Sequence, residues 1–85
     1  MREITGDRKV TVDAFAQDVS IGYRGFLLVN SGQAPVYIHD KSDGKAATED
    51  SFCLPAGMMI QTPLCCDTLS VVGSEEGELR LLFLG

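Results

Sequence analysis

Residues 26–39 of this chain read FLLVNSGQAPVYIH, and this stretch decides the fold class. Its first four residues form a continuous apolar run, which is typical of a strand covered on both faces. Asn30 and Gly32 follow, and both tolerate the positive φ angles that tight turns use. Pro35 stands at the start of the next apolar segment, where its missing N–H matters least. The stretch therefore predicts two strands joined as a β-hairpin over residues 26–39.

Short apolar or alternating segments continue on both sides of this stretch. Before it, Val10 and Val12 alternate with polar residues, and Val19 and Ile21 do the same. After it, we expect strands at residues 51–54, 58–61, 69–72 and 79–84, with an exposed loop at 40–50 and a polar hairpin turn at 73–77. Many short strands at close spacing are typical of a sandwich or barrel. The sequence therefore predicts one all-β domain, a small antiparallel β-sandwich or barrel.

The length of the chain makes an additional source of stability expected. Its 85 residues are enough for one domain with a thin stability margin. Chains of this size usually add disulfides, a metal or oligomerisation. Cys53, Cys65 and Cys66 do not form a spaced disulfide framework, and one histidine without a Cys-x-x-Cys pair gives no zinc site. Oligomerisation is therefore the expected addition.

The charge distribution argues against several classes of partner. The net charge is −5, and the seven Lys and Arg residues are spread along the chain. Nucleic-acid and anionic-membrane binding both need clustered basic residues, so neither is expected. The polar start of the chain lacks the apolar region of a signal peptide, and no apolar run approaches the roughly 18 residues of a membrane helix. We therefore expect a protein made in the cytoplasm, with reduced thiols.

The last predicted strand carries apolar side chains on both faces. Leu79, Leu81 and Phe83 point to one face, while Leu82 and Leu84 point to the other. A strand of a small isolated sandwich should be apolar on one face and wet on the other. The excess indicates contact with another subunit. The residues expected at this interface are Leu82, Leu84, Val72, Met59 and Ile4.

His39 is the candidate general base of the sequence, with Cys53 or Ser51 as candidate nucleophile. Asp40 follows it directly, and adjacent strand residues point to opposite faces. Asp40 is therefore poorly placed to orient the imidazole, and we expect a surface histidine at a strand end. The sequence predicts no catalytic residue, so the protein is not expected to be an enzyme.

The acidic loop is the candidate site for a hard cation. Its carboxylates do not have the spacing of an EF-hand, so a solvated loop is expected and no metal or cofactor is predicted. The carboxylates concerned are Asp40, Asp43, Glu49 and Asp50.

Residues 26–38 resemble a hairpin of small phage and prophage virion proteins, in which Val, Asn, a small residue and Gly precede Pro-Val-Tyr-Ile. The Pro-Ala-Gly turn at 55–57, the Leu-Ser-Val-Val strand at 69–72 and the final Leu-Gly extend the resemblance over residues 24–85. It implies a jelly-roll β-sandwich at 9–85 in capsid decoration or in a head–tail or tail-fibre assembly. It also implies a symmetric oligomer, often a trimer, and an N-terminal arm at 1–8. The run 58–60 and the pair Cys65-Cys66 depart from the pattern.

These observations predict a structural assembly protein that acts through protein–protein contacts, in a virion if the resemblance holds. The alternative is a ligand-binding module for a cell-surface sugar or protein, with Tyr23 and Tyr37 as its aromatic contacts. A small enzyme using His39 is a third hypothesis, which we do not favour.

Overall fold

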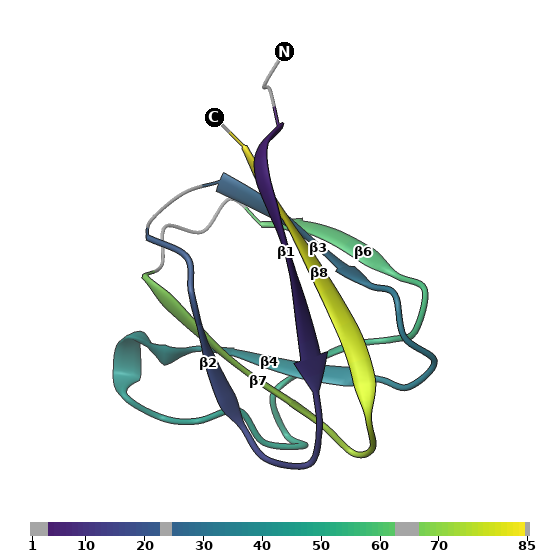
Figure 1. Cartoon of the computed structure of the whole chain (residues 1–85). Helices are drawn as coiled ribbons and strands as arrows, with labels where there is room; N and C mark the ends of the chain where they lie inside the picture. The colour runs from purple at the N-terminus through teal and green to yellow at the C-terminus, as the bar shows by residue number, and fades with distance from the viewer. Residues whose placement is uncertain (1–3, 23–24, 63–66, 85) are drawn as a thin grey trace.

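The computed structural model describes residues 4–22, 25–62 and 67–84. Within these ranges the chain forms two four-stranded antiparallel sheets that face each other (Figure 1). No helix in the described ranges is long and apolar enough to span a membrane. The elements in chain order are β1 (Ile4–Val12), β2 (Gln17–Ser20), β3 (Gly25–Asn30), β4 (Val36–Asp40), the 3-10 helix η1 (Lys41–Asp43), β5 (Phe52–Leu54), β6 (Met59–Thr62), β7 (Thr68–Gly73) and β8 (Gly77–Leu84).

The strand order is that of a jelly roll. One sheet has the order β1-β8-β3-β6 and the other β2-β7-β4-β5. Four of the antiparallel pairs, β1–β8, β2–β7, β3–β6 and β4–β5, together form one long doubled ribbon with β4–β5 at its tip. Rolling this ribbon adds the pairs β3–β8 and β4–β7. The prediction of a small antiparallel sandwich of jelly-roll type is confirmed.

The predicted hairpin over residues 26–39 is wrong in its pairing. Both strands exist, but β3 and β4 belong to different sheets, so the intervening residues carry the chain across the sandwich. Asn30 holds this crossing from a fully buried position. Its Nδ2 donates to the carbonyl oxygens of Ala34 at 2.8 Å and Leu54 at 2.9 Å, and its Oδ1 accepts from the Gly32 N–H at 3.1 Å. A buried amide must be satisfied in this way, and here it fixes a crossover rather than a tight hairpin turn.

Gly32 makes the same crossing possible by its lack of a side chain. A Cβ at this position would lie 2.7 Å from the backbone nitrogen of Glu78. The Ser31 and Gly32 N–H groups both donate to the Glu78 carbonyl oxygen at 3.1 Å, which fastens the crossing to the start of β8. Residues 73–77 also join strands of opposite sheets, so the predicted polar hairpin turn is likewise a crossover.

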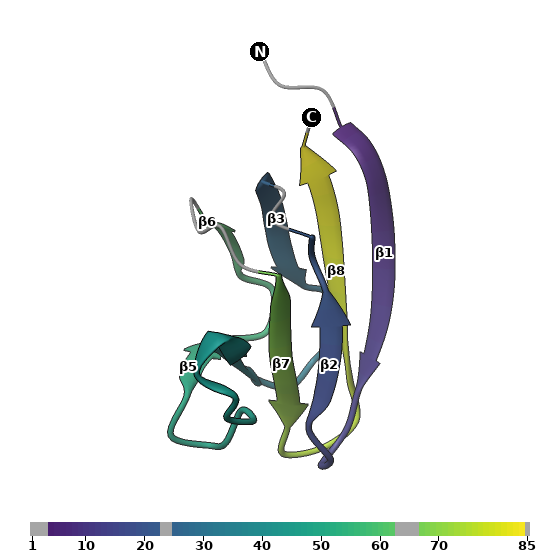
Figure 2. The ribbon, with the colours of Figure 1, turned by 90° about the vertical axis from the view of Figure 1, so that its left-hand side faces the viewer.

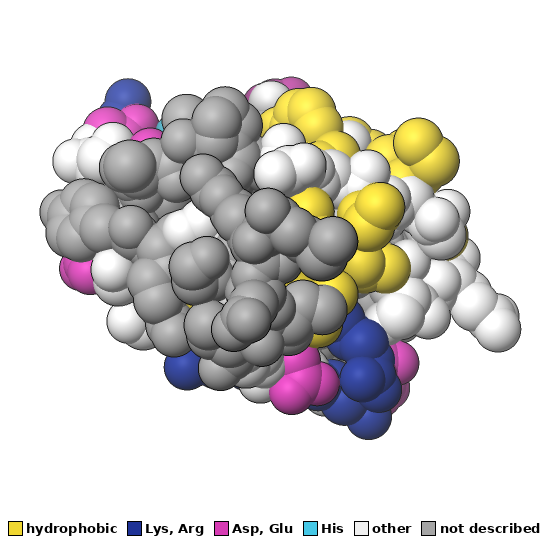
Figure 3. Space-filling model, turned by 90° about the horizontal axis from the view of Figure 1, so that it is seen from above, with side chains coloured by type: hydrophobic (Ala, Val, Ile, Leu, Met, Phe, Trp, Pro, Cys, Tyr) yellow, Lys and Arg dark blue, Asp and Glu magenta, His cyan; other side chains and the backbone are white. Residues whose placement is uncertain are grey.

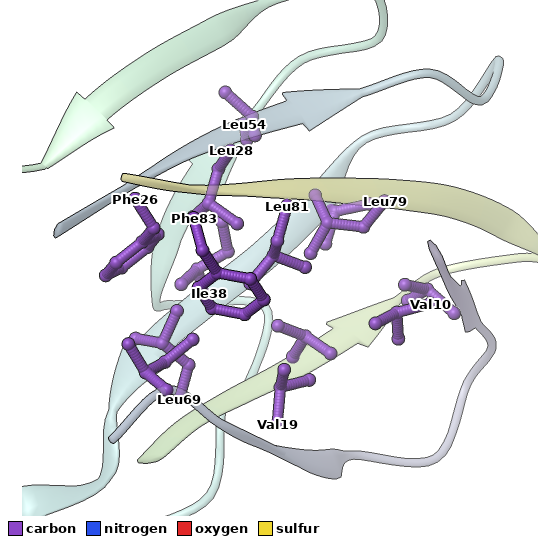
Figure 4. Packing of buried hydrophobic residues seen from close by; sticks show 14 residues of the cluster. Val10, Val19, Phe26, Leu28, Ile38, Leu54, Leu69, Leu79, Leu81 and Phe83 are labelled. Atoms are coloured by element: carbon purple, nitrogen blue, oxygen red, sulfur yellow. The ribbon is translucent and has the colours of Figure 1, made fainter. Parts of the chain in front are cut away.

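The core fills the space between the two sheets. Leu79, Leu81 and Phe83 all point into it, as the alternation in β8 predicted, and none is more than 3% exposed. Figure 4 shows them packed against side chains of the opposite sheet, among them Ile38 and Leu69. Full burial of each such side chain contributes about 1.5–3 kcal/mol. The interior of the sandwich is therefore an apolar core.

The start of the chain differs from the expected arm. Strand β1 begins at Ile4 and pairs with β8 as far as Val12, with an irregularity between Ile4 and Gly6. The expected boundary at residue 9 falls inside this continuous strand, so residues 4–8 are part of the sandwich. Residues 1–3 lie outside the described residues.

Candidate interaction surface

The outer face of the sheet β1-β8-β3-β6 carries a group of apolar side chains. Leu27 and Val29 of β3 point outward and are half-buried, between neighbours that are fully buried. Leu27 pairs in register with Leu82 of β8, and Val29 pairs with Met59 of β6. Met59 is 58% exposed, and Leu82 is half-buried. We call Leu27, Val29, Met59 and Leu82 the apolar patch. Figure 3 shows hydrophobic side chains gathered on one side of the molecule, next to Lys and Arg side chains.

A charged strip adjoins the apolar patch on the same face. It consists of Asp7 and Lys9 on β1 and of Glu78 and Arg80 on β8. Glu78 Oε1 lies 3.5 Å from Lys9 Nζ and 3.3 Å from Arg80 Nε. Neither contact is a hydrogen bond, and Glu78 Oε1 is buried between the two cationic side chains. Asp7, Lys9 and Arg80 are exposed and present their charges on this face.

The register arranges patch and strip in two parallel rows across the sheet. One row runs Lys9, Arg80, Val29, Met59, and the next runs Asp7, Leu82, Leu27, Gln61. Each row is charged at the β1 end and lacks charge at the β6 end. An apolar area bordered by charged groups is the usual composition of a protein–protein contact.

On the opposite outer face, that of the sheet β2-β7-β4-β5, the outward-pointing residues of the inner strand β7 are buried by the chain itself. Ser70 and Val72 of β7 alternate with core residues and so point outward, yet Ser70 is 0% and Val72 8% exposed. Residues 41–51, which join β4 to β5, lie against this face, and Ala47 among them is buried. The Ala47 N–H donates to Ser70 Oγ at 2.9 Å. We call residues 41–51 the strap; the exposed loop predicted here is thus anchored at its middle.

Charged contacts hold the first turn of the strap. Lys41 Nζ lies 2.7 and 2.8 Å from the carboxylate oxygens of Asp18 on β2. His39 Nε2 lies 2.9 Å from both carboxylate oxygens of Asp43. The Lys45 backbone N–H and then His39 lower the pKa of Asp43 by hydrogen bonding to its charged form. The strap is therefore tied to β2, β4 and β7.

The predicted interface residues fall into three groups. Met59 and Leu82 lie in the apolar patch. Val72 lies on the opposite sheet, on the side that the strap covers, and is buried. The backbones of Ile4 and Leu84 pair with each other at the end of the β1–β8 ladder, but their side chains are outside the described structure. Their place in an interface stays a prediction.

Sequence reasoning missed two members of the patch, Leu27 and Val29. The signal was present, because the apolar run 26–29 places side chains on both faces of β3. A continuous apolar run is typical of a strand covered on both faces, so it does not by itself predict an open outer face. Phe15, in the β1–β2 connection, was also not selected and is 81% exposed. An isolated aromatic residue in a polar segment gives no signal of this kind.

The candidate catalytic residues are not brought together as a triad. His39 contacts Asp43, four residues along the chain, while Asp40 Oδ1 accepts a hydrogen bond from the Ser42 N–H at 2.9 Å. Ser51 Oγ accepts from the Thr48 N–H at 3.0 Å, and Cys53 is exposed on β5. The geometry thus makes His39 part of the strap's attachment.

The candidate ligand-binding residues give no assembled site in the part of the chain that the structure describes. No group of three or more His, Cys, Asp or Glu residues there is placed to hold a metal ion. Tyr37 is half-buried on β4, in register with Val72. Tyr23, Cys65 and Cys66 lie outside the described residues.

A shallow groove of about 340 Å³ follows the edge where β1 and β2 meet. Figure 2 shows the two strands at the same side of the molecule, running in opposite directions. Two side chains bridge them: Arg8 donates to the Ser20 carbonyl oxygen at 3.1 Å, and Gln17 donates to the Thr11 carbonyl oxygen. The Arg8 guanidinium also lies 5.7 Å from the centre of the Phe83 ring. These bonds occupy edge carbonyls that would otherwise be open to another strand.

Known proteins are similar to this chain in fold and not in sequence. No protein-family model matches the chain, and no curated protein sequence does. The structure is similar to that of a protein from Neisseria meningitidis, with a TM-score of 0.65, 18% identity and coverage of 100% of this chain and 84% of the other. It is also similar to a cupin-2 domain containing protein from Shewanella frigidimarina, with a TM-score of 0.60, 11% identity and coverage of 96% and 78%. PirA gives a TM-score of 0.61 at 10% identity, with 95% of each chain covered. At these identities the likenesses show a shared two-sheet β-sandwich fold and nothing of its activity.

Proposed function

We propose that this domain is a protein-interaction module that takes part in an assembly through the outer face of the sheet β1-β8-β3-β6. One observation carries the proposal: the described chain leaves the apolar patch of this face in contact with water, whereas the outward-pointing Val72 of the other face is buried. Removing apolar surface from water is favourable by about 25 cal/mol of free energy per Å², and the patch still has apolar surface in contact with water. A partner that covers the patch removes this contact.

The charged strip supports the same role. Asp7, Lys9, Glu78 and Arg80 stand at the border of the patch, where charges guide association and set the orientation of a partner. The side chains of Asp7, Lys9 and Arg80 are exposed, so their charged ends can contact a partner.

The virion context remains a proposal that depends on the resemblance of residues 26–38 and of the later strands. A small sandwich with one open and one covered face suits attachment to a larger particle, and this compatibility is what supports it. The ligand-binding alternative receives less support, because Tyr37 is half-buried and stands beside buried Val72, so little of its ring is open to a ligand.

A site-specific crosslinking experiment tests the proposal. A photoreactive phenylalanine analogue is placed at Leu27 in the patch or, as a control, at Ser42 in the strap, in the cell that makes the protein. We expect a discrete crosslinked protein product from position 27 that is lost when Leu82→Asp is added, and none from position 42. Equal products from both positions, or none from position 27, would contradict the proposal.

A further inference from the structure

We propose that the occupant of this face is a second copy of the chain, packed face to face across a two-fold axis. This inference rests on the proposed function and names the partner. The axis lies in the plane of the interface, perpendicular to the strands, and passes between the Asp7 row and the Lys9 row.

This axis makes the face complementary to itself. The two-fold rotation places each row opposite the other row of the partner, with β1 over β1 and β3 over β3. Lys9 then faces Asp7 of the partner subunit, and the reverse contact repeats the pair. Val29 faces Leu27 of the partner subunit in the same manner. One rotation therefore matches opposite charges at one side of the interface and aliphatic side chains near the other.

Arg80 and Met59 fit the same arrangement. Arg80 faces Leu82 of the partner subunit, where its aliphatic stem covers the leucine while its guanidinium stays beside Glu78. Met59 faces Gln61 of the partner subunit, and both side chains are exposed in the single chain. No charge is placed against an equal charge among these four contacts, which is the condition for a stable contact between identical faces.

The dimensions of the face set the strength of the dimer. Four strands spaced about 4.8 Å apart make a face about 19 Å wide, and the eight residues of β8 extend about 27 Å. The two copies together then bury on the order of 1,000 Å², which is at the lower limit for a specific interface. We therefore expect a dimer that dissociates on dilution. A ring such as a trimer needs two different complementary surfaces on each copy, whereas the two rows of this one face already complement each other.

Charge exchange at the two central positions tests the inference. Lys9→Asp leaves acidic side chains at both positions 7 and 9, and Asp7→Lys leaves basic ones at both. By light scattering behind a sizing column, the wild type should have about twice the 9.2 kDa mass of one chain and fall toward that mass on dilution. Each variant alone should dimerise at least tenfold more weakly. An equimolar mixture of the two should restore a dimer, because the heterodimer places the two carboxylates of one chain opposite the two lysines of the other.

Matched controls separate the local contact from the change in net charge. Lys45→Asp in the strap and Glu75→Lys in the β7–β8 connection alter the charge as much as Lys9→Asp and Asp7→Lys do, at exposed positions off this face. Both should keep the wild-type dimer. Circular dichroism checks that every variant retains its β structure.

The outcomes distinguish this inference from the proposed function. A wild-type monomer at all concentrations would overturn the second copy as occupant, while a crosslink from position 27 to a different protein would keep the proposed function. A dimer that is lost in Leu82→Asp but not in either charge variant, or that the mixture fails to restore, would overturn the two-fold arrangement alone. A dimer unaffected by Leu82→Asp would show that the two copies meet elsewhere and would overturn the inference, while the crosslink from position 27 would still decide the proposed function.

Discussion

The two outer faces of this sandwich start from similar strands and end in different environments. On the sheet β2-β7-β4-β5, outward-pointing Val72 and Ser70 are covered, and the strap contributes Ala47 and its hydrogen bond to that cover. On the sheet β1-β8-β3-β6, Leu27, Val29 and Leu82 are half-buried and keep part of their apolar surface in water. The difference teaches that one small domain can treat outward-pointing apolar residues in two ways. The same chain buries Val72 on one face, and we propose that a partner covers the apolar patch on the other.

The largest expected effect comes from placing the same charge on each face. Val72→Asp puts a carboxylate in a position that is 8% exposed, and an unpaired buried charge of this kind is strongly destabilising. We expect the free energy of unfolding to fall by more than about 4 kcal/mol, which is in the exceptional range for one substitution. Urea denaturation followed by circular dichroism measures it.

Leu82→Asp is the matched substitution on the open face. Because Leu82 is only half-buried, an aspartate in its place can reach water. At a dilution where the wild type is monomeric, the loss in free energy of unfolding should be at least twofold smaller than for Val72→Asp. Equal losses of unfolding free energy in Val72→Asp and Leu82→Asp would show that the two faces do not differ in this way.

The next effect concerns the hydrogen bond that anchors the strap. Ser70→Ala leaves the buried Ala47 N–H without its acceptor, which costs about 1–3 kcal/mol. We expect faster amide hydrogen exchange at Ala47 and its neighbours, with little change in β1 or β3. Ser74→Ala, at an exposed position in the β7–β8 connection, serves as the control. Unchanged exchange in Ser70→Ala would show that the strap is held by other contacts.

A smaller effect is expected from Met59→Gln in the apolar patch. Met59 is 58% exposed, so the free energy of unfolding should stay within about 0.5 kcal/mol of the wild-type value. Self-association should nevertheless weaken several-fold, since the substitution removes apolar area from the contact. Thermal unfolding and light scattering on the same sample measure both quantities, and a large loss of stability would place Met59 in the fold rather than in the interface.

The smallest effect is a pH dependence of the strap. The lowered pKa of Asp43 means that its charged form is favoured in the folded chain, so its contribution is present above the pKa of an unfolded aspartate and disappears as the pH falls through the lower folded value. Asp43→Asn should therefore flatten the decline of the melting temperature in this acid range. Asp50→Asn, at an exposed position of the strap, is the control. If the melting temperature of Asp43→Asn declined with falling pH as steeply as that of the wild type, the contact between His39 and Asp43 would not help to hold the strap.

The positions of most strands follow from periodicity in the sequence. Alternation at Val10 and Val12 and in residues 79–84 reports which side chains face the core, because successive strand residues point to opposite faces. Pairing was harder to predict. Asn30 and Gly32 have the residue types of a tight turn, but their side-chain and backbone bonds to Leu54 and Glu78 come from residues far along the chain. Local turn chemistry therefore predicted a hairpin where the chain crosses between sheets.

The open and covered faces could be predicted only in part. The excess of apolar residues in β8 correctly indicated that Leu82 points away from the core. The sequence does not tell on which sheet an excess residue lies, so Val72 was grouped with Leu82 although they occupy opposite sheets. Nothing in a polar segment marks Ala47 as the residue that becomes buried. The position of the strap depends on its tertiary contacts with Ser70 and Asp18, which cannot be predicted from local sequence patterns.

The doubled-ribbon topology also determines the order in which the sheets can be completed. Strand β8 lies between β1 and β3, so β1 has no partner in its sheet until residues 77–84 are in place. By contrast, β4 and β5 are joined by the strap and can pair with a short loop closure. We expect folding to proceed from this tip toward the β1–β8 end, and to be slow for a chain of this length because most pairings join distant segments. During that interval β3 exposes an unpaired apolar edge, which makes the incomplete β1-β8-β3-β6 sheet the aggregation-prone part of the folding chain.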